Sequence, residues 1–194
     1  MATIEGLGVN WSGEEEHIML ELKRISKEAI PRALAKAERY RLLNEPHEAE
    51  SICRDVLHTD PGNQEAQAAL VLALTDQFGS RHGADMRKAR EALAELTGEY
   101  ERAYYGGIIC ERWAKAQFEA HVPTHMTHDW IEEAMSLYQQ AEALRPGGND
   151  DAVLRWNSCL RFIESTLHTH KLEDTGREEG FSDEPPSTWE KRTP

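Results

Sequence analysis

A proline-punctuated pair of helical patterns occupies residues 39–74 and constrains the fold more than any other stretch of the sequence. Apolar side chains recur at intervals of four and three residues, from Ala49 through Cys53 to Val56, which is the spacing of one buried helix face. Pro46 stands where a helix would begin and Pro61 follows where it would end, since proline cannot donate the hydrogen bond that a helix interior requires. The pattern therefore predicts two antiparallel helices joined by a short turn.

Apolar residues at the same intervals of three and four predict helices along most of the chain. They are expected over residues 12–29, 31–43, 46–57, 65–78, 86–96, 100–120, 130–144 and 149–168. Ser12 and Glu15 have the spacing of a capping box at the first helix start. Gly106 and Gly107 lie inside the helix over 100–120, where together they cost about 1–2 kcal/mol relative to alanine. We therefore expect a close helix–helix contact at these glycines.

The length and composition favour a single all-α domain. The 194 residues, of which 39% are hydrophobic, are enough to bury a core without disulfides. We expect a flexible N-terminus over residues 1–11, a helical domain over 12–168 and a disordered acidic tail over 169–194. The tail is rich in Glu, Asp, Gly, Ser and Pro, a composition that buries too little apolar surface to order itself.

Charge and cysteine content narrow the class of protein. A net charge of −13 opposes binding to nucleic acid and to anionic membrane surfaces. No apolar run approaches the roughly 18 residues of a membrane span, and the first residues do not resemble a secretory signal, which favours the cytoplasm. Cys53, Cys110 and Cys159 each lie in a helical pattern, so we expect them to be reduced core residues.

The paired helices resemble tetratricopeptide repeats, whose unit is about 34 residues long. Ala37 and Tyr40 match the small residue and the aromatic of the first helix, Ala49 matches the alanine of the second, and Pro61 matches the turn that follows. A second occurrence has the same twelve-residue step from alanine to proline and is carried by Ala134, Tyr138, Ala141, Leu144 and Pro146. The resemblance implies a right-handed superhelical solenoid of about three antiparallel helical hairpins, with flanking N-terminal and C-terminal capping helices.

This resemblance also implies a function. The first helices of stacked hairpins line a concave surface, which is the usual ligand surface of the family. The chain is therefore expected to be a non-enzymatic scaffold or adaptor that binds a peptide or partner protein. The residues expected on that surface are Leu34, Glu38, Arg41, Ala68, Leu72, Thr75, Asp76, Tyr104, Ile108, Arg112, Asn157 and Arg161. An apolar strip flanked by Arg41, Arg112 and Arg161 suits an extended or helical peptide with acidic side chains.

Two alternative functions remain open on the sequence. His121, His125 and His128 lie in a predicted loop over residues 121–129, and imidazoles are common ligands of transition metals, so metal binding is one alternative. Homo-oligomeric assembly through the apolar first helices is the other. The sequence contains no nucleophile elbow, phosphate-binding loop, dinucleotide fingerprint or zinc-protease motif, so we predict neither an enzyme nor a cofactor.

Overall fold

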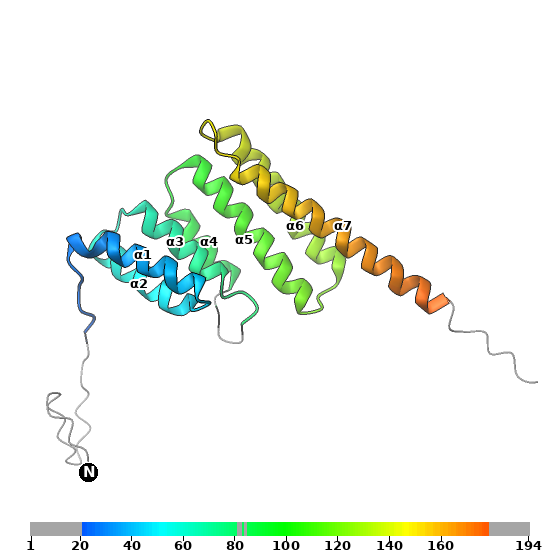
Figure 1. The fold of residues 1–194 in the computed structure, drawn as a ribbon, viewed down its shortest axis with the longest axis horizontal. Coiled ribbons are helices and arrows are strands. Elements are labelled where there is room, and N and C mark those ends of the chain that lie inside the picture. The colour runs from blue at the N-terminus through cyan, green and yellow to red at the C-terminus, as the bar shows by residue number, and fades with distance from the viewer. Residues whose placement is uncertain (1–20, 81–82, 84, 179–194) are drawn as a thin grey trace, which may run out of the picture.

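The computed structural model describes residues 21–80, 83 and 85–178 of the chain, and within this part the protein is all-α. No strand occurs among the described residues, and seven α-helices follow one another across the molecule in chain order (Figure 1). Their bounds are α1 Ile30–Leu42, α2 Pro46–Thr59, α3 Gln64–Thr75, α4 Met86–Ala94, α5 Glu99–Glu119, α6 Thr124–Leu144 and α7 Asp151–Glu178. None of the described helices is long and apolar enough to cross a membrane.

Packing between the helices is mostly sequential. Each helix contacts the next one in the chain, and the pair α5 and α6 has the most extensive contact. Two further contacts skip a helix, because α1 packs against α3 and α3 packs against α5. The three helices α1, α3 and α5 therefore lie next to one another and together form one surface.

The turns between helices use residues that suit their backbone conformations. Asn44 follows α1 with a φ of 59°, a left-handed conformation that asparagine tolerates better than most residues, and Pro46 then opens α2. Asn63 caps α3, because its side chain accepts a hydrogen bond from the Ala66 amide at 2.9 Å. Asp85 caps α4 in the same way through the Lys88 amide at 2.9 Å. These caps explain why the helices begin close to their predicted positions.

The predicted helix–helix contact residues lie in the core. Ala49, Cys53 and Val56 of α2 are fully buried. The matching residues of α6, Ala134, Tyr138 and Ala141, are fully buried as well. The burial predicted from the apolar period is thus confirmed at both occurrences of the pattern.

The predicted close approach at the paired glycines is confirmed for Gly107. A Cβ atom added there would lie 2.5 Å from Cε1 of Tyr138, so α5 and α6 meet too closely for a larger residue. At Gly106 the nearest atoms would be at 3.5 Å, which is ordinary van der Waals contact.

The helix predicted over residues 12–29 is wrong in its described part. Residues 21–26 are not helical, and only a short 3₁₀ turn, Lys27–Ala29, precedes α1. Leu22 is 80% exposed and gains little from packing, whereas Ile25 packs against Ile30, Leu34, Val56 and Ala66 without forming a helix. The predicted flexible segment 1–11 and residues 12–20 lie outside the described residues.

Two other helix boundaries are corrected. Helix α6 begins at Thr124 rather than at residue 130, because buried Thr127 extends the stripe of Ile131 and Ala134 by one turn. Helix α7 continues to Glu178, past the predicted end at residue 168, so the predicted tail 169–194 begins within a helix. Residues 179–194 lie outside the described residues.

Candidate functional site: a groove across three helices

An open groove with a volume of about 520 Å³ crosses the surface formed by α1, α3 and α5. Each helix contributes residues at intervals of three or four, so one face of each helix lines the groove. The lining residues are Pro31, Leu34, Ala35, Glu38 and Arg41 of α1, Gln64, Glu65, Ala68, Ala69 and Leu72 of α3, and Glu101 and Tyr105 of α5.

The floor of the groove is apolar. Ala68, Ala69 and Leu72 are half-buried, and Leu34 beside them is buried. Tyr105 closes the floor on the α5 side, and burial raises the pKa of its phenol, so the side chain is neutral at physiological pH. Apolar side chains of a ligand would displace water from this floor favourably.

Three exposed glutamates line the groove, one on each helix, and the carboxylate of Glu101 lies over Gly98 at the start of α5. Glu65 and Glu101 lie in the first turns of α3 and α5, where the positive end of the helix dipole favours acidic side chains. Glu38 lies in the middle of α1, where the dipole gives no such preference. Among the described residues, no ion pair joins any of the three to a lysine, arginine or histidine.

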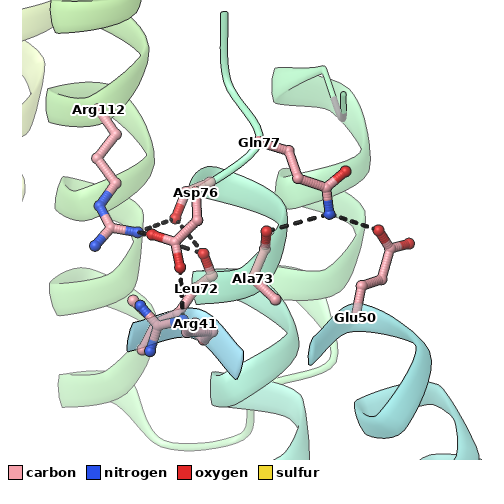
Figure 2. Close-up of polar contacts among 8 residues, drawn as sticks. Arg41, Glu50, Leu72, Ala73, Asp76, Gln77 and Arg112 are labelled. Atoms are coloured by element: carbon pink, nitrogen blue, oxygen red, sulfur yellow. Dashed lines mark hydrogen bonds and ion pairs between the residues drawn. The ribbon is translucent and has the colours of Figure 1, made fainter. Parts of the chain in front are cut away.

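A charged cluster of Arg41, Asp76 and Arg112 holds the three groove helices together (Figure 2). Arg41 Nε donates to Asp76 Oδ2 at 2.6 Å, and Arg112 donates to Asp76 Oδ1. Arg112 also donates to Thr75 Oγ1 at 2.6 Å and to the Leu72 carbonyl at 3.3 Å. Burial lowers the pKa of Arg112 and the Asp76 charge opposes that effect, so the guanidinium stays protonated at neutral pH. The cluster thus links α1, the end of α3 and α5.

A second polar contact fixes α3 against α2. Gln77 Nε2 donates to Glu50 Oε2 at 2.7 Å and to the Ala73 carbonyl at 3.2 Å, as Figure 2 shows. Burial would raise the pKa of Glu50, but the hydrogen bonds from Gln77 and Arg54 outweigh it and lower that pKa. The carboxylate is therefore ionised at neutral pH, and it anchors the end of α3 behind the groove.

The structure distributes the predicted surface residues over several environments. Five of them line the groove: Leu34, Glu38, Arg41, Ala68 and Leu72. Thr75, Asp76 and Arg112 lie in or beside the charged cluster. Asn157 and Arg161 belong to α7 and do not line the groove.

On α5 the predicted positions need correction. Ile108 is only 1% exposed and packs in the core, so a partner cannot reach its side chain. Tyr104 packs in the same cluster and stacks on Tyr100 with ring centroids 5.7 Å apart. The groove is lined instead by Glu101 and Tyr105. Tyr105 follows the predicted Tyr104 by one residue in the sequence. Tyr104 and Ile108 have the same spacing of four as Glu101 and Tyr105, so spacing alone does not distinguish the two faces of α5.

The three histidines considered as metal ligands do not form a site. His121 lies in the turn after α5 with a φ of 60°, and His125 is exposed in the first turn of α6. His128 is half-buried, with Nε2 at 3.2 Å from Thr166 Oγ1. Within the part of the chain that the structure describes, no three His, Cys, Asp or Glu side chains come close enough to share an ion.

A buried carboxylate links the last three helices. Glu111 of α5 accepts hydrogen bonds from the Tyr138 hydroxyl at 2.6 Å and from Lys115 Nζ at 2.6 Å. Arg155 of α7 completes an ion pair with it at 3.5 Å. Burial, together with the neighbouring Glu111 charge, raises the pKa of Tyr138, so its hydroxyl remains a donor. The cluster thus links α5, α6 and α7.

The three cysteines are free and buried, as predicted. Burial raises the pKa of Cys53 and Cys110 to about 11 and that of Cys159 to about 12. The thiols are therefore protonated at neutral pH, and they are poor nucleophiles and poor metal ligands.

Comparison of the chain with protein-family models, with curated proteins and with solved structures finds no match.

Proposed function

We propose that this protein is a non-enzymatic interaction scaffold that binds a peptide segment of a partner protein in the groove across α1, α3 and α5. The observation that carries the proposal is the groove itself, which is open, has an apolar floor and spans three separate helices. Its volume of about 520 Å³ accommodates several side chains of a ligand. A surface of this kind suits an extended or helical segment with apolar anchors.

The proposal includes a tetratricopeptide-like solenoid as the architecture behind the groove. Support comes from the contacts of α1 with α3 and of α3 with α5, which add to the sequential packing. Further support comes from Ala49 and Ala134, which are fully buried and precede Pro61 and Pro146 by the same distance. In a solenoid of this kind the first helices form the concave binding face.

The composition of the groove supports binding rather than catalysis. Its lining consists of Pro, Leu, Ala, Glu, Arg, Gln and Tyr, and it includes no serine, cysteine or histidine. The described lining thus lacks a hydroxyl or thiol nucleophile beside a histidine base, which is the arrangement that serine and cysteine hydrolases use.

Groove-blocking substitution tests the proposal. Ala35 is exposed on the groove wall, so Ala35→Trp fills part of the groove without entering the core. Ala35 also borders a second depression. Exposed Lys36 lines that depression but not the groove, so Lys36→Trp is a control that should leave groove binding unchanged. Ala143 is exposed on α6 outside the groove, which makes Ala143→Trp the matched control. Random dodecapeptides displayed on phage are selected on the full chain, and the selected peptides are then measured against all three variants by fluorescence anisotropy.

The scaffold proposal predicts peptides that bind the unmodified protein, the Ala143→Trp variant and the Lys36→Trp variant equally. The same peptides should bind Ala35→Trp at least about tenfold more weakly, a loss of about 1.4 kcal/mol, while circular dichroism shows unchanged helicity. Selected peptides that bind all three variants equally would place the binding surface elsewhere. A selection that yields no binding peptide would contradict peptide recognition altogether.

A further inference from the structure

We infer that the groove selects segments that combine apolar residues with lysine or arginine. This inference rests on the proposed function, because it names the chemistry of the partner for the same groove. It also reverses the expectation from the sequence, in which Arg41, Arg112 and Arg161 favoured a ligand with acidic side chains.

The first step is that the arginines are already engaged. Arg41 and Arg112 share the carboxylate of Asp76, and their side chains are only 19% and 23% exposed. An acidic ligand would have to compete with Asp76, which the fold already holds in place beside both guanidinium groups. Arg161 lies on α7 and does not line the groove, so it cannot substitute for them.

The second step concerns the three carboxylates around the floor. Glu38, Glu65 and Glu101 come from different helices but face one groove, and in the described chain none of them forms an ion pair with a cation. Several negative charges around an apolar hollow make the electrostatic potential within it more negative. Helix-dipole stabilisation accounts for Glu65 and Glu101 in their first turns, but it does not account for Glu38 in the middle of α1.

The third step is that the other cations of α1 belong to a different surface. Arg32, Lys36 and Arg39 line a second depression of about 660 Å³ on the adjoining face of the helix, together with Tyr40 and Leu43, and Ala35 borders both hollows. Helix α1 thus separates a basic surface from the acidic groove. Among the described residues that line the groove, the single cation is Arg41, which is paired with Asp76, against three glutamates.

The chain's own ends carry a net negative charge, although residues 179–194 include Trp189 near the basic pair Lys191 and Arg192. Residues 1–20 contain four glutamates and no lysine or arginine, and residues 179–194 contain four acidic and two basic residues. Both segments carry the same sign of charge as the groove, and a second copy of the whole chain carries a net charge of −13. Charge complementarity therefore favours a separate, basic partner.

Lysine and arginine also suit the apolar floor. Their aliphatic stems can lie on Ala68 and Leu72 while the charged head groups reach Glu38, Glu65 or Glu101 at the rim. A segment with one or two apolar anchors and neighbouring basic residues would satisfy both features of the groove.

The experiment uses the dodecapeptides whose binding is lost in Ala35→Trp and retained in both Ala143→Trp and Lys36→Trp, so that only groove ligands are analysed. Their affinities are compared between two triple variants that change the net charge equally. The groove triple replaces by glutamine the residues Glu38, Glu65 and Glu101. The control triple replaces by glutamine three exposed carboxylates outside the groove, Glu48, Glu132 and Glu164.

We expect the selected peptides to be enriched in lysine or arginine beside apolar residues. The groove triple should weaken their binding about tenfold, since each exposed pair contributes roughly 0.5 kcal/mol, and the control triple should change it less than twofold. Raising the salt concentration from 50 to 500 mM should weaken binding to the unmodified protein and have less effect on the groove triple. If the triple variant loses helicity, the single variant Glu38→Gln provides the same test, with an expected loss of peptide affinity of about twofold.

Two results would overturn the inference about charge. In the first, the groove-dependent peptides are acidic or uncharged. In the second, they bind the groove triple with the same affinity as the unmodified protein. In either outcome the scaffold proposal would stand, because binding would still depend on Ala35. A selection without any groove-dependent peptide would overturn both.

Discussion

At the scale of single residues, the contact between Gly107 and Tyr138 sets the distance between α5 and α6. A methyl group at Gly107 would lie 2.5–2.9 Å from three carbons of the Tyr138 ring. That ring is fully buried and held by the hydrogen bond from its hydroxyl to Glu111, so it has little room to move. We predict that Gly107→Ala lowers the free energy of unfolding by about 1–3 kcal/mol in urea titrations, despite the better helix propensity of alanine.

Gly106→Ala is the matched control for that prediction. Its added methyl group would meet Leu137 and Leu93 at 3.5 Å, an ordinary contact distance. Helix propensity should then dominate, and we expect a free energy of unfolding that is unchanged or raised by up to about 1 kcal/mol. Equal losses in the two variants would show that crowding against Tyr138 is not the cause.

The buried thiols predict how stability depends on pH. The folded-state pKa values of Cys53, Cys110 and Cys159, about 11 to 12, lie above the value of about 8.5 for an exposed thiol. Between these values the folded protein binds more protons than the unfolded chain, so stability is full below about pH 8.5 and falls as pH rises toward 11. Urea midpoints measured from pH 7 to 10.5 should therefore decrease, and substituting the cysteines with alanine should reduce the slope. A midpoint that is constant to pH 10.5 would contradict this account.

At the scale of helices, the cluster of Arg41, Asp76 and Arg112 joins α1, α3 and α5. Asp76→Asn removes the charge that both guanidinium groups share and leaves two cations close together. We predict a loss of about 1–3 kcal/mol in the free energy of unfolding, smaller than for a fully buried pair because Asp76 is partly exposed. The loss should shrink when Arg41→Gln is already present, since one of the two cations is then gone.

The exposed pair of Glu142 and Arg145 serves as the control for the Asp76 prediction. Glu142→Gln removes a surface contact of 3.3 Å within one turn and should cost less than about 0.5 kcal/mol. If Asp76→Asn cost no more than this control, the cluster would not hold the groove helices together.

Most of the helices could be predicted because the apolar period, the prolines and the cap residues all indicate the same helix ends. Pro46 and the Asn63 cap fixed the starts of α2 and α3 closely. The wrong helix predictions have a different cause. A periodic stripe of apolar residues identifies one face of a helix, but it does not identify the element that packs against that face. In the stripe predicted over residues 12–29, Leu22 stays exposed and Ile25 packs against residues of α1, α2 and α3 without a helix. The buried side chain of Thr127, by contrast, adds a turn to α6 that a polar residue type does not suggest.

The candidate site was predictable only in part, for a related reason. The groove-lining residues of α1 and α3 were predicted because the hairpin pattern determines which face of each helix points away from its partner helix. On α5 the run of apolar residues from Tyr104 to Ile109 offers two adjacent faces, so Tyr104 was favoured over Tyr105. Packing against neighbouring helices decides between such faces, and local sequence does not contain that information.

At the scale of the whole molecule, the charge of the groove depends on contacts between distant parts of the chain. Asp76 pairs with both Arg41 and Arg112 across separations of 35 and 36 residues, which leaves the cluster with one net positive charge. Sequence composition therefore could not show that two apparent ligand-binding arginines are engaged within the protein. The surface that remains open to a partner is apolar and acidic, and it exists only because α1, α3 and α5 lie next to one another.

The central claim is that this groove is the surface that binds a partner. The most direct test is a titration of the ¹⁵N-labelled full chain with a selected dodecapeptide, followed through backbone amide chemical shifts. We predict that the largest changes fall on α1, α3 and α5, at residues such as Ala35, Ala68 and Tyr105, and that α6 and α7 change little. The largest changes on α6 or α7, or saturable binding without changes in the groove, would contradict the claim.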